Sequence, residues 1–104
     1  MVTAVEALAQ IAEKGDAGAI AALLAGKASI DARARDGDTA LWGAAVENHL
    51  PVVKRLMRHG ADPSLKNTVL ISGHEWTPHQ AAVREGRTLI AQWLLAVRGW
   101  SVAE

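Results

Sequence analysis

The histidine and acidic side chains of this chain could in principle bind a metal ion. His74, Glu75 and His79 superficially match the His-Glu-x-x-His motif, in which two imidazoles bind zinc and the carboxylate acts as a general base. The spacing is wrong, because three residues rather than two separate Glu75 from the second histidine. Pro78 also prevents the continuous helix that would bring both imidazoles to one face. The pattern therefore predicts no metal site.

Nucleophilic catalysis has no better support in the sequence. The chain has no cysteine, no Gly-rich phosphate loop and no Gly-x-Ser-x-Gly motif around any of its serines. The carboxylates of Asp36 and Asp38 lie beside Arg33 and Arg35, where solvated ion pairs or contacts with a partner would explain them. We therefore expect a non-catalytic protein that has no metal and no cofactor.

Composition narrows the class of protein further. The 104 residues are enough for one domain, and half of them are apolar, although Phe and Tyr are absent. Eleven basic residues balance eleven acidic ones, so no overall field gathers nucleic acid or an anionic membrane. The N-terminal stretch lacks a basic region and carries Glu6, and no run approaches the roughly 20 apolar residues of a membrane span. We expect a cytoplasmic protein with no nucleic-acid or membrane partner.

Apolar residues recur at helical spacing along the chain, which predicts six short helices. Thr39 is suited to cap the third helix through its hydroxyl, and Pro51 fits the first turn of the fourth. Asn48 stands at a break between helices, where it tolerates a left-handed backbone. For the first, second, fifth and sixth helices we also predict the bounds, which are Val5–Lys14, Ala17–Ala25, Pro78–Glu85 and Thr88–Val97.

The stretch Gly37–Asp62, GDTALWGAAVENHLPVVKRLMRHGAD, resembles one nearly complete ankyrin repeat. It has a Gly-x-Thr-x-Leu start, a short Ala-rich helix, a break, a second apolar helix and a Gly-Ala-Asp end. A backward shift of 33 residues places Gly15 under Asn48, which is the repeat length of ankyrin arrays. A forward shift of 38 residues brings Thr39 to Thr77, so five extra residues lie between the second and third units.

This resemblance implies an all-α ankyrin-repeat solenoid of three stacked helix-turn-helix units joined by β-hairpin-like fingers. We place the units of this single domain, residues 1–104, at about residues 3–33, 34–71 and 72–104. Both end units depart from the family pattern, as expected for units that face water on one side. The chain is either a minimal array with ordinary caps, or a fragment that needs a partner for stability. The resemblance also gives His49 a structural role in its turn.

Ankyrin arrays bind proteins through their fingers and their inner, concave helices, so the resemblance implies a partner-binding surface. Trp76 is its sharpest element, because Trp and Arg dominate binding hot spots. Trp76 either anchors a partner or folds over the insertion, and the apolar run Val69–Ile71 either packs on Trp76 or meets the partner. Trp42 is either half-buried between fingers or on the concave face. The implied binding residues are Arg33, Arg35, Asp36, Asp38, Trp42, Val46, Glu47, His74, Trp76, Arg84 and Glu85.

The expected function is therefore a non-catalytic protein–protein interaction module whose partner the sequence does not identify. Two alternatives stay open: an inhibitor or immunity-type protein that blocks an enzyme or toxin, and a self-assembling structural subunit. The chain is expected to be a monomer, or a weak homodimer that forms through the ends of the stack. Trp100 either covers the last unit or adds to such a contact.

Overall fold

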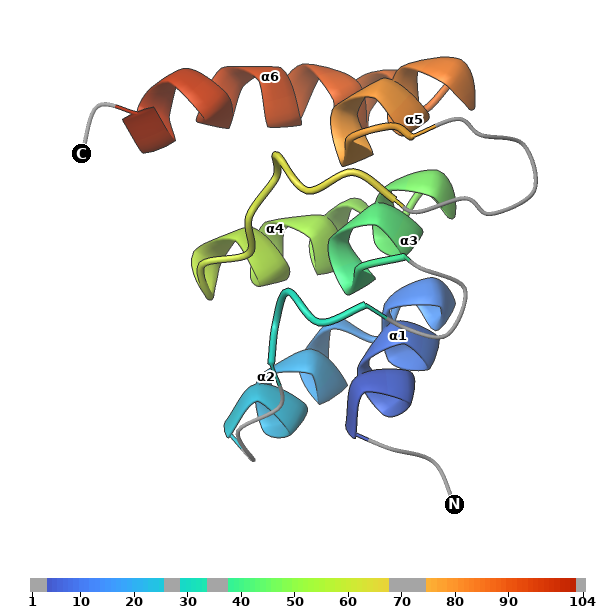
Figure 1. Cartoon of the computed structure of the whole chain (residues 1–104), viewed down its shortest axis with the longest axis vertical. Coiled ribbons are helices and arrows are strands. Elements are labelled where there is room, and N and C mark those ends of the chain that lie inside the picture. Colours follow the sequence, from blue (N-terminus) through green and yellow to red (C-terminus); the bar gives the residue numbers. More distant parts are fainter. Residues whose placement is uncertain (1–3, 26–28, 34–37, 68–74, 103–104) are drawn as a thin grey trace.

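The computed structural model describes residues 4–25, 29–33, 38–67 and 75–102. Within these ranges the chain forms helices that follow one another in antiparallel pairs (Figure 1). The helices are α1 (Ala4–Lys14), α2 (Ala17–Ala25), α3 (Ala40–Val46), α4 (Leu50–Arg58), α5 (Pro78–Arg84) and α6 (Thr88–Val102). No helix in these ranges is long and apolar enough to cross a membrane.

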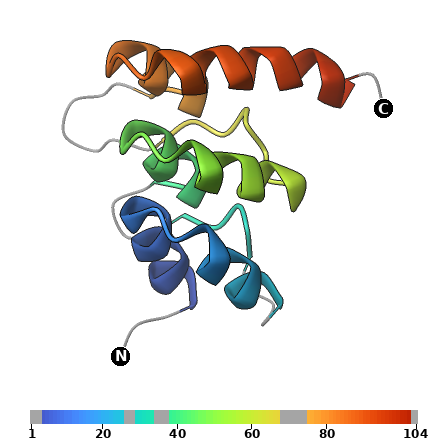
Figure 2. The ribbon, with the colours of Figure 1, turned by 180° about the vertical axis from the view of Figure 1, so that it is seen from behind.

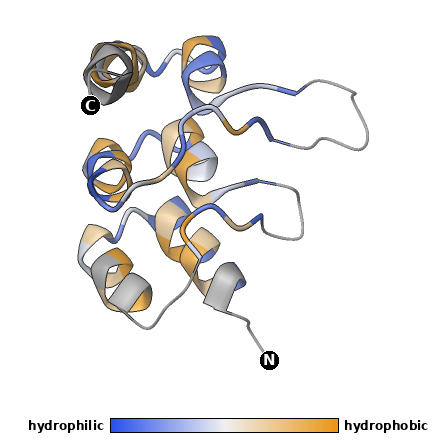
Figure 3. Cartoon of the chain, turned by 60° about the vertical axis from the view of Figure 1, so that its left-hand side comes forward, coloured by the Kyte–Doolittle hydropathy of each residue, from blue (hydrophilic) through white to orange (hydrophobic). Residues whose placement is uncertain are grey.

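The helix pairs stack on one another in two rows (Figures 1 and 2). Helices α1, α3 and α5 pack in sequence to form an inner row, and α2, α4 and α6 form an outer row beside it. The described parts of the loops that join one pair to the next extend sideways from the inner row (Figure 3). We call the loop between α2 and α3 the first finger and the loop between α4 and α5 the second finger.

Small side chains allow the two rows to approach closely. Ala12, Ala44, Ala45 and Ala82 are fully buried, each on the inner row. Larger apolar side chains fill the space between the rows, and each contributes roughly 1.5–3 kcal/mol when it leaves water. The largest of these fully buried side chains are Leu8, Ile20, Leu41, Leu56, Ile90, Val52 and Val53.

The turn inside each helix pair uses the same left-handed backbone conformation. Gly15, Asn48 and Gly86 have φ values of 82°, 67° and 74°, and each stands shortly after the inner helix of its pair. Glycine takes this conformation without a steric penalty, and Asn is among the side chains that tolerate it best. The expectation for Asn48 is therefore confirmed.

Threonine caps fix the starts of α3 and α5. The hydroxyl of Thr39 accepts the backbone N–H of Trp42 at 3.2 Å, which confirms the predicted cap. Thr77 forms a full capping box with Gln80, since each side chain accepts the backbone N–H of the other residue. Pro51 stands in the first turn of α4 as predicted, where its missing N–H costs little.

The end of α6 was predicted wrongly. The sequence places it near Val97, at the point where an ankyrin unit usually closes with Gly-Ala-Asp, but the helix runs on to Val102. In α4 the chain leaves the helix through Gly60, which has a φ of 89°. Gly99 instead lies inside α6, where a helical glycine costs only about 1 kcal/mol relative to alanine.

Candidate functional site

Trp76 and Arg84 form a stacked pair on the last helix pair. Trp76 is the second-last residue before α5 begins, and Arg84 is the last residue of that helix. The Arg84 guanidinium carbon lies 4.4 Å from the centroid of the indole ring, a cation–π distance. Arg84 is exposed and Trp76 is half-buried, so the guanidinium lies on the outer side of the indole ring. Both residues were singled out from the sequence, and the fold brings them together.

Asn67 holds Trp76 in place at the base of the second finger. The backbone N–H of Asn67 donates to the carbonyl oxygen of Trp76 at 2.9 Å. The Trp76 backbone N–H in turn donates to Oδ1 of Asn67 at 2.8 Å. Asn67 is buried, so these bonds are shielded from water. The two bonds close the finger in the manner of a hairpin, although the described residues include no β-strand.

The first finger is tied to the start of the second. Nη1 of Arg33 donates to the carbonyl oxygen of Lys66, and Oδ1 of Asp31 accepts the backbone N–H of Asp62 at 2.9 Å. Arg33 was predicted to bind a partner, and in the folded chain its side chain reaches the neighbouring finger. The two fingers are therefore positioned relative to each other before any partner arrives.

Asp62 and Ser64 form a local turn beside this contact. Oδ1 of Asp62 accepts the Ser64 hydroxyl at 2.6 Å and the Ser64 backbone N–H at 2.9 Å. The bond from the hydroxyl, and then the bond from the backbone, lower the pKa of Asp62 below its ordinary value, against a smaller opposing effect of burial. The ionised carboxylate is thus the form that holds the turn.

Neighbouring helix pairs are also joined through their turns. Nε2 of His49 donates to the carbonyl oxygen of Glu13 at 2.7 Å, which confirms the predicted structural role of this histidine. Nε of Arg87 donates to the carbonyl oxygen of Val46 at 2.8 Å. Neither Arg87 nor Asn67 was singled out from the sequence. Arg87 could have been found from the forward shift of 38 residues, which places it on His49.

The remaining candidate residues differ in their exposure. Trp42 is half-buried, and its indole N–H is buried without a hydrogen-bond partner among the described residues. Asp38 and Val46 are half-buried, whereas Glu47 and Glu85 are exposed at the ends of α3 and α5. Several predictions concern residues or side chains that lie outside the described part of the chain: Arg35, Asp36, His74, Val69–Ile71 and Trp100.

The described residues include no group of three or more His, Cys, Asp or Glu side chains that could hold a metal ion. The exposed groups are instead the Arg84 guanidinium, which lies over the half-buried Trp76 ring, and separate carboxylates, and such groups form ion pairs. We call the stacked pair of Trp76 and Arg84, together with the exposed Glu47 and Glu85 at the ends of α3 and α5, the Trp76 surface.

Stacked helix pairs with sideways fingers define a helical repeat protein of the solenoid class. The family model for ankyrin repeats (3 copies) matches residues 8–102, and this chain belongs to that family. The chain is also similar to ankyrin repeat and KH domain-containing protein mask-1 from Caenorhabditis elegans, at 36% identity over 89 residues. The match covers 86% of this chain but about 3% of that protein. Ankyrin repeats are generally protein–protein interaction modules and are typically non-catalytic.

Proposed function

We propose that this chain is a protein-binding module whose partner docks on the Trp76 surface. Its membership of the ankyrin-repeat family supports the general class of function. The observation that best supports this site is the position of the Arg84 guanidinium carbon, 4.4 Å from the centroid of the Trp76 ring. A cation held in this way loses little side-chain entropy when it binds, which makes it a good anchor for a partner. The proposed compartment is the cytoplasm, where ankyrin-repeat proteins are often found.

The partner should present a carboxylate to Arg84. A guanidinium that stacks on a ring through its face keeps its N–H groups in the plane of the guanidinium, and these match the two oxygens of a carboxylate. Arg84 is exposed, so such a group reaches it without displacing protein side chains. Glu85 follows Arg84 in the sequence, and Glu47 ends the neighbouring inner helix; both are exposed and favour basic groups on the same partner. The partner surface is thus an acidic residue flanked by basic ones.

A random-peptide library tests this assignment while the natural partner is still unidentified. Peptides selected on the immobilised wild-type chain should be enriched in Asp or Glu, and calorimetry should show affinity falling at least about tenfold in Arg84→Glu. Arg58→Glu is the matched control, because Arg58 is also exposed but lies at the end of α4 in the outer row. Its affinity for the same peptides should stay within about twofold of the wild type.

Two results would count against the proposal. Selected peptides without acidic residues would remove Arg84 as the anchor. Equal losses in Arg84→Glu and Arg58→Glu would show a general charge effect rather than a defined site. Thermal melting of both variants is needed beside the binding data, and neither exposed substitution should move the midpoint by more than a few degrees. An inhibitor that covers a target protein would use the same surface.

A further inference from the structure

The three helices of the outer row contain no acidic residue. The chain has eleven Asp and Glu residues, and none of them lies in α2, α4 or α6. Asp16 stands just before α2 and Asp62 shortly after α4, and each accepts a backbone N–H of its own turn. The formal net charge of +0 therefore does not show how unevenly the charges are distributed over the molecule.

Basic side chains gather on the outward side of α4. Lys54, Arg55 and Arg58 stand at positions i, i+1 and i+4, which share one side of an α-helix. Arg58 is exposed and the other two are partly exposed, and no ion pair joins them to a carboxylate of the described residues. The fully buried residues of this helix are on its opposite side: Val52, Val53 and Leu56.

This arrangement of charges works against the stability of α4. Lys54 and Arg58 are four residues apart, and like charges at this spacing repel each other on a helix surface. A helix side that meets only water is more stable with opposite charges at the same spacing. The lack of any carboxylate in the three outer helices thus indicates a surface that meets an anionic partner.

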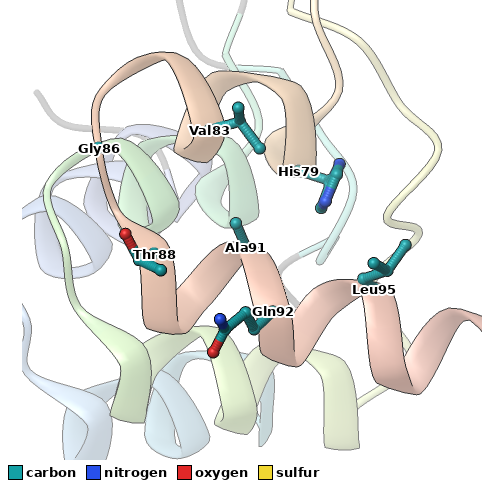
Figure 4. A pocket seen from close by; sticks show the side chains of 7 residues that line it. All are labelled: His79, Val83, Gly86, Thr88, Ala91, Gln92 and Leu95. Carbon is teal, nitrogen blue, oxygen red and sulfur yellow. The ribbon is translucent and has the colours of Figure 1, made fainter.

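Large apolar side chains stand on the same row, on the neighbouring helix α6. The 38-residue shift places Leu89 on Pro51 and Trp93 on Arg55, so both belong to the outward side of α6. Leu89 is 69% exposed and Trp93 is half-buried. Leu89 does not line the hollow at the end of the stack, whose side chains Figure 4 shows. Because α4 and α6 pack together, we define one outer face by five residues: Lys54, Arg55, Arg58, Leu89 and Trp93.

We propose that the outer face binds the surface of a membrane that contains anionic lipids. Anionic headgroups attract basic side chains that lie close to the bilayer. The apolar side chain of Leu89 enters the boundary between headgroups and hydrocarbon, where the ring of Trp93 is also suited to lie. The proposed surface is separate from the Trp76 surface, which belongs to the inner row, so a membrane-bound chain still presents Trp76 and Arg84 to a protein partner.

The breadth of the acid-free surface favours a bilayer over other anions. A planar bilayer covers a whole row of helices, and no carboxylate interrupts this row. A single acidic peptide would need only the strip that it covers to be free of carboxylates. A nucleic-acid backbone offers no apolar environment for Leu89. The expectation of no membrane partner was based on the balanced net charge and on the lack of a spanning segment, and neither describes a surface that meets lipid from one side.

Sedimentation of the full chain with phospholipid vesicles tests the proposal. Binding should be at least about tenfold stronger to phosphatidylcholine vesicles with about 30% phosphatidylserine than to phosphatidylcholine alone, and it should weaken with added salt. The double variant Lys54→Glu, Arg58→Glu should lose at least about tenfold in affinity. The matched control is Lys14→Glu, Lys66→Glu, which changes the net charge equally at exposed positions of α1 and the second finger. Its affinity should stay within about twofold of the wild type.

Leu89→Ser tests the apolar part of the contact. It should weaken vesicle binding at least about threefold, because less apolar surface enters the bilayer. Leu95→Ser is the control, since Leu95 is on the same helix and 56% exposed but lines the hollow at the end of the stack. Melting curves of each variant confirm that only folded protein is compared.

Several results would overturn the proposal. These are a wild type that does not bind anionic vesicles at about 20 mM salt, equal binding to neutral and anionic vesicles, and equal losses in the two double variants. An unchanged affinity in Leu89→Ser would also overturn it. Displacement of the chain from vesicles by duplex DNA or by inorganic phosphate, at equal ionic strength, would assign the cations to nucleic acid or to free phosphate instead.

Discussion

Nε of Arg87 donates to the carbonyl oxygen of Val46 at 2.8 Å, and so joins the turn of the last helix pair to the inner helix of the pair before it. His49 makes the equivalent bond to Glu13 at 2.7 Å. Val46 and Glu13 occupy matching positions near the ends of their inner helices, where carbonyl groups lack helical partners. A histidine and an arginine therefore make equivalent bonds to a backbone carbonyl at successive junctions between helix pairs.

Loss of the Arg87 bond should weaken the last junction. Arg87→Ala removes a charged donor from a half-buried carbonyl, and we expect the free energy of unfolding to fall by about 1–3 kcal/mol. Urea denaturation followed by circular dichroism measures this loss. Arg87→His, which introduces the side chain used by the middle pair, should recover part of it. An Arg87→Ala variant as stable as the wild type would show that the bond contributes nothing.

Gly15 and Gly86 allow a matched test of the left-handed turns. Gly86→Ala meets no atom within 4 Å, so it should cost only the conformational penalty of about 1–2 kcal/mol. In Gly15→Ala the new Cβ would lie 2.6 Å from Nδ1 of His49, whose ring is held by its bond to Glu13. The loss of stability should therefore be clearly larger in Gly15→Ala. Equal losses in thermal melts of the two variants would contradict this account.

Asn67 should be more important for the second finger than its position in a loop suggests. Asn67→Ala leaves the Trp76 backbone N–H without its acceptor, and we expect a loss of about 1–3 kcal/mol. Hydrogen exchange at the Trp76 amide should become faster in the variant, which separates a local effect from general unfolding. Unchanged protection of that amide would show that the side-chain bond does not hold Trp76.

The repeat pattern predicted most of the fold because it depends on local signals. Thr39, Pro51 and Asn48 each perform a backbone task that their own chemistry defines, and the structure places them as expected. The end of α6 was missed because a glycine can either stop a helix or sit inside it. Contacts with neighbouring elements decide between those outcomes, and the repeat pattern does not show these contacts.

The candidate site was harder to predict because it depends on contacts between distant residues. Arg84 and Trp76 were proposed separately, from positions that vary in the family, and the sequence did not show that they stack. Partner binding by Arg33 stays a prediction, and the sequence did not show that its side chain reaches the carbonyl oxygen of Lys66 in the next finger. Asn67 gave no signal, since a loop Asn is ordinary until its burial is known.

Low pH should destabilise the start of the second finger, because it protonates the Asp62 carboxylate. Its pKa is lowered in the folded chain, so the ionised carboxylate favours folding at pH values above its unfolded pKa. This contribution is lost as pH falls through the lower, folded pKa, in the region below about pH 4. Ser64→Ala removes the hydroxyl bond and should raise the pKa of Asp62, as measured by NMR titration of its carboxyl carbon. An unchanged titration curve would contradict the assignment.

Trp42 offers a test of a buried group without a partner. Trp42→Phe removes the indole N–H that has no hydrogen bond among the described residues, along with part of the ring. Lost packing and relief of the unpaired donor act in opposite directions, so the net change should stay below about 1.5 kcal/mol. Chemical denaturation measures it. A loss of about 3 kcal/mol or more would be typical of a large core truncation and would contradict this expectation.

In the side-chain bonds that join neighbouring helix pairs, the donor follows the acceptor in the sequence. In both junctions the donor, His49 or Arg87, belongs to the later helix pair, and the acceptor carbonyl belongs to the earlier one. A ribosome releases the earlier pair first, so each acceptor is already made when its donor emerges. Assembly from the N-terminal end therefore leaves neither His49 nor Arg87 waiting for an acceptor that has yet to be synthesised.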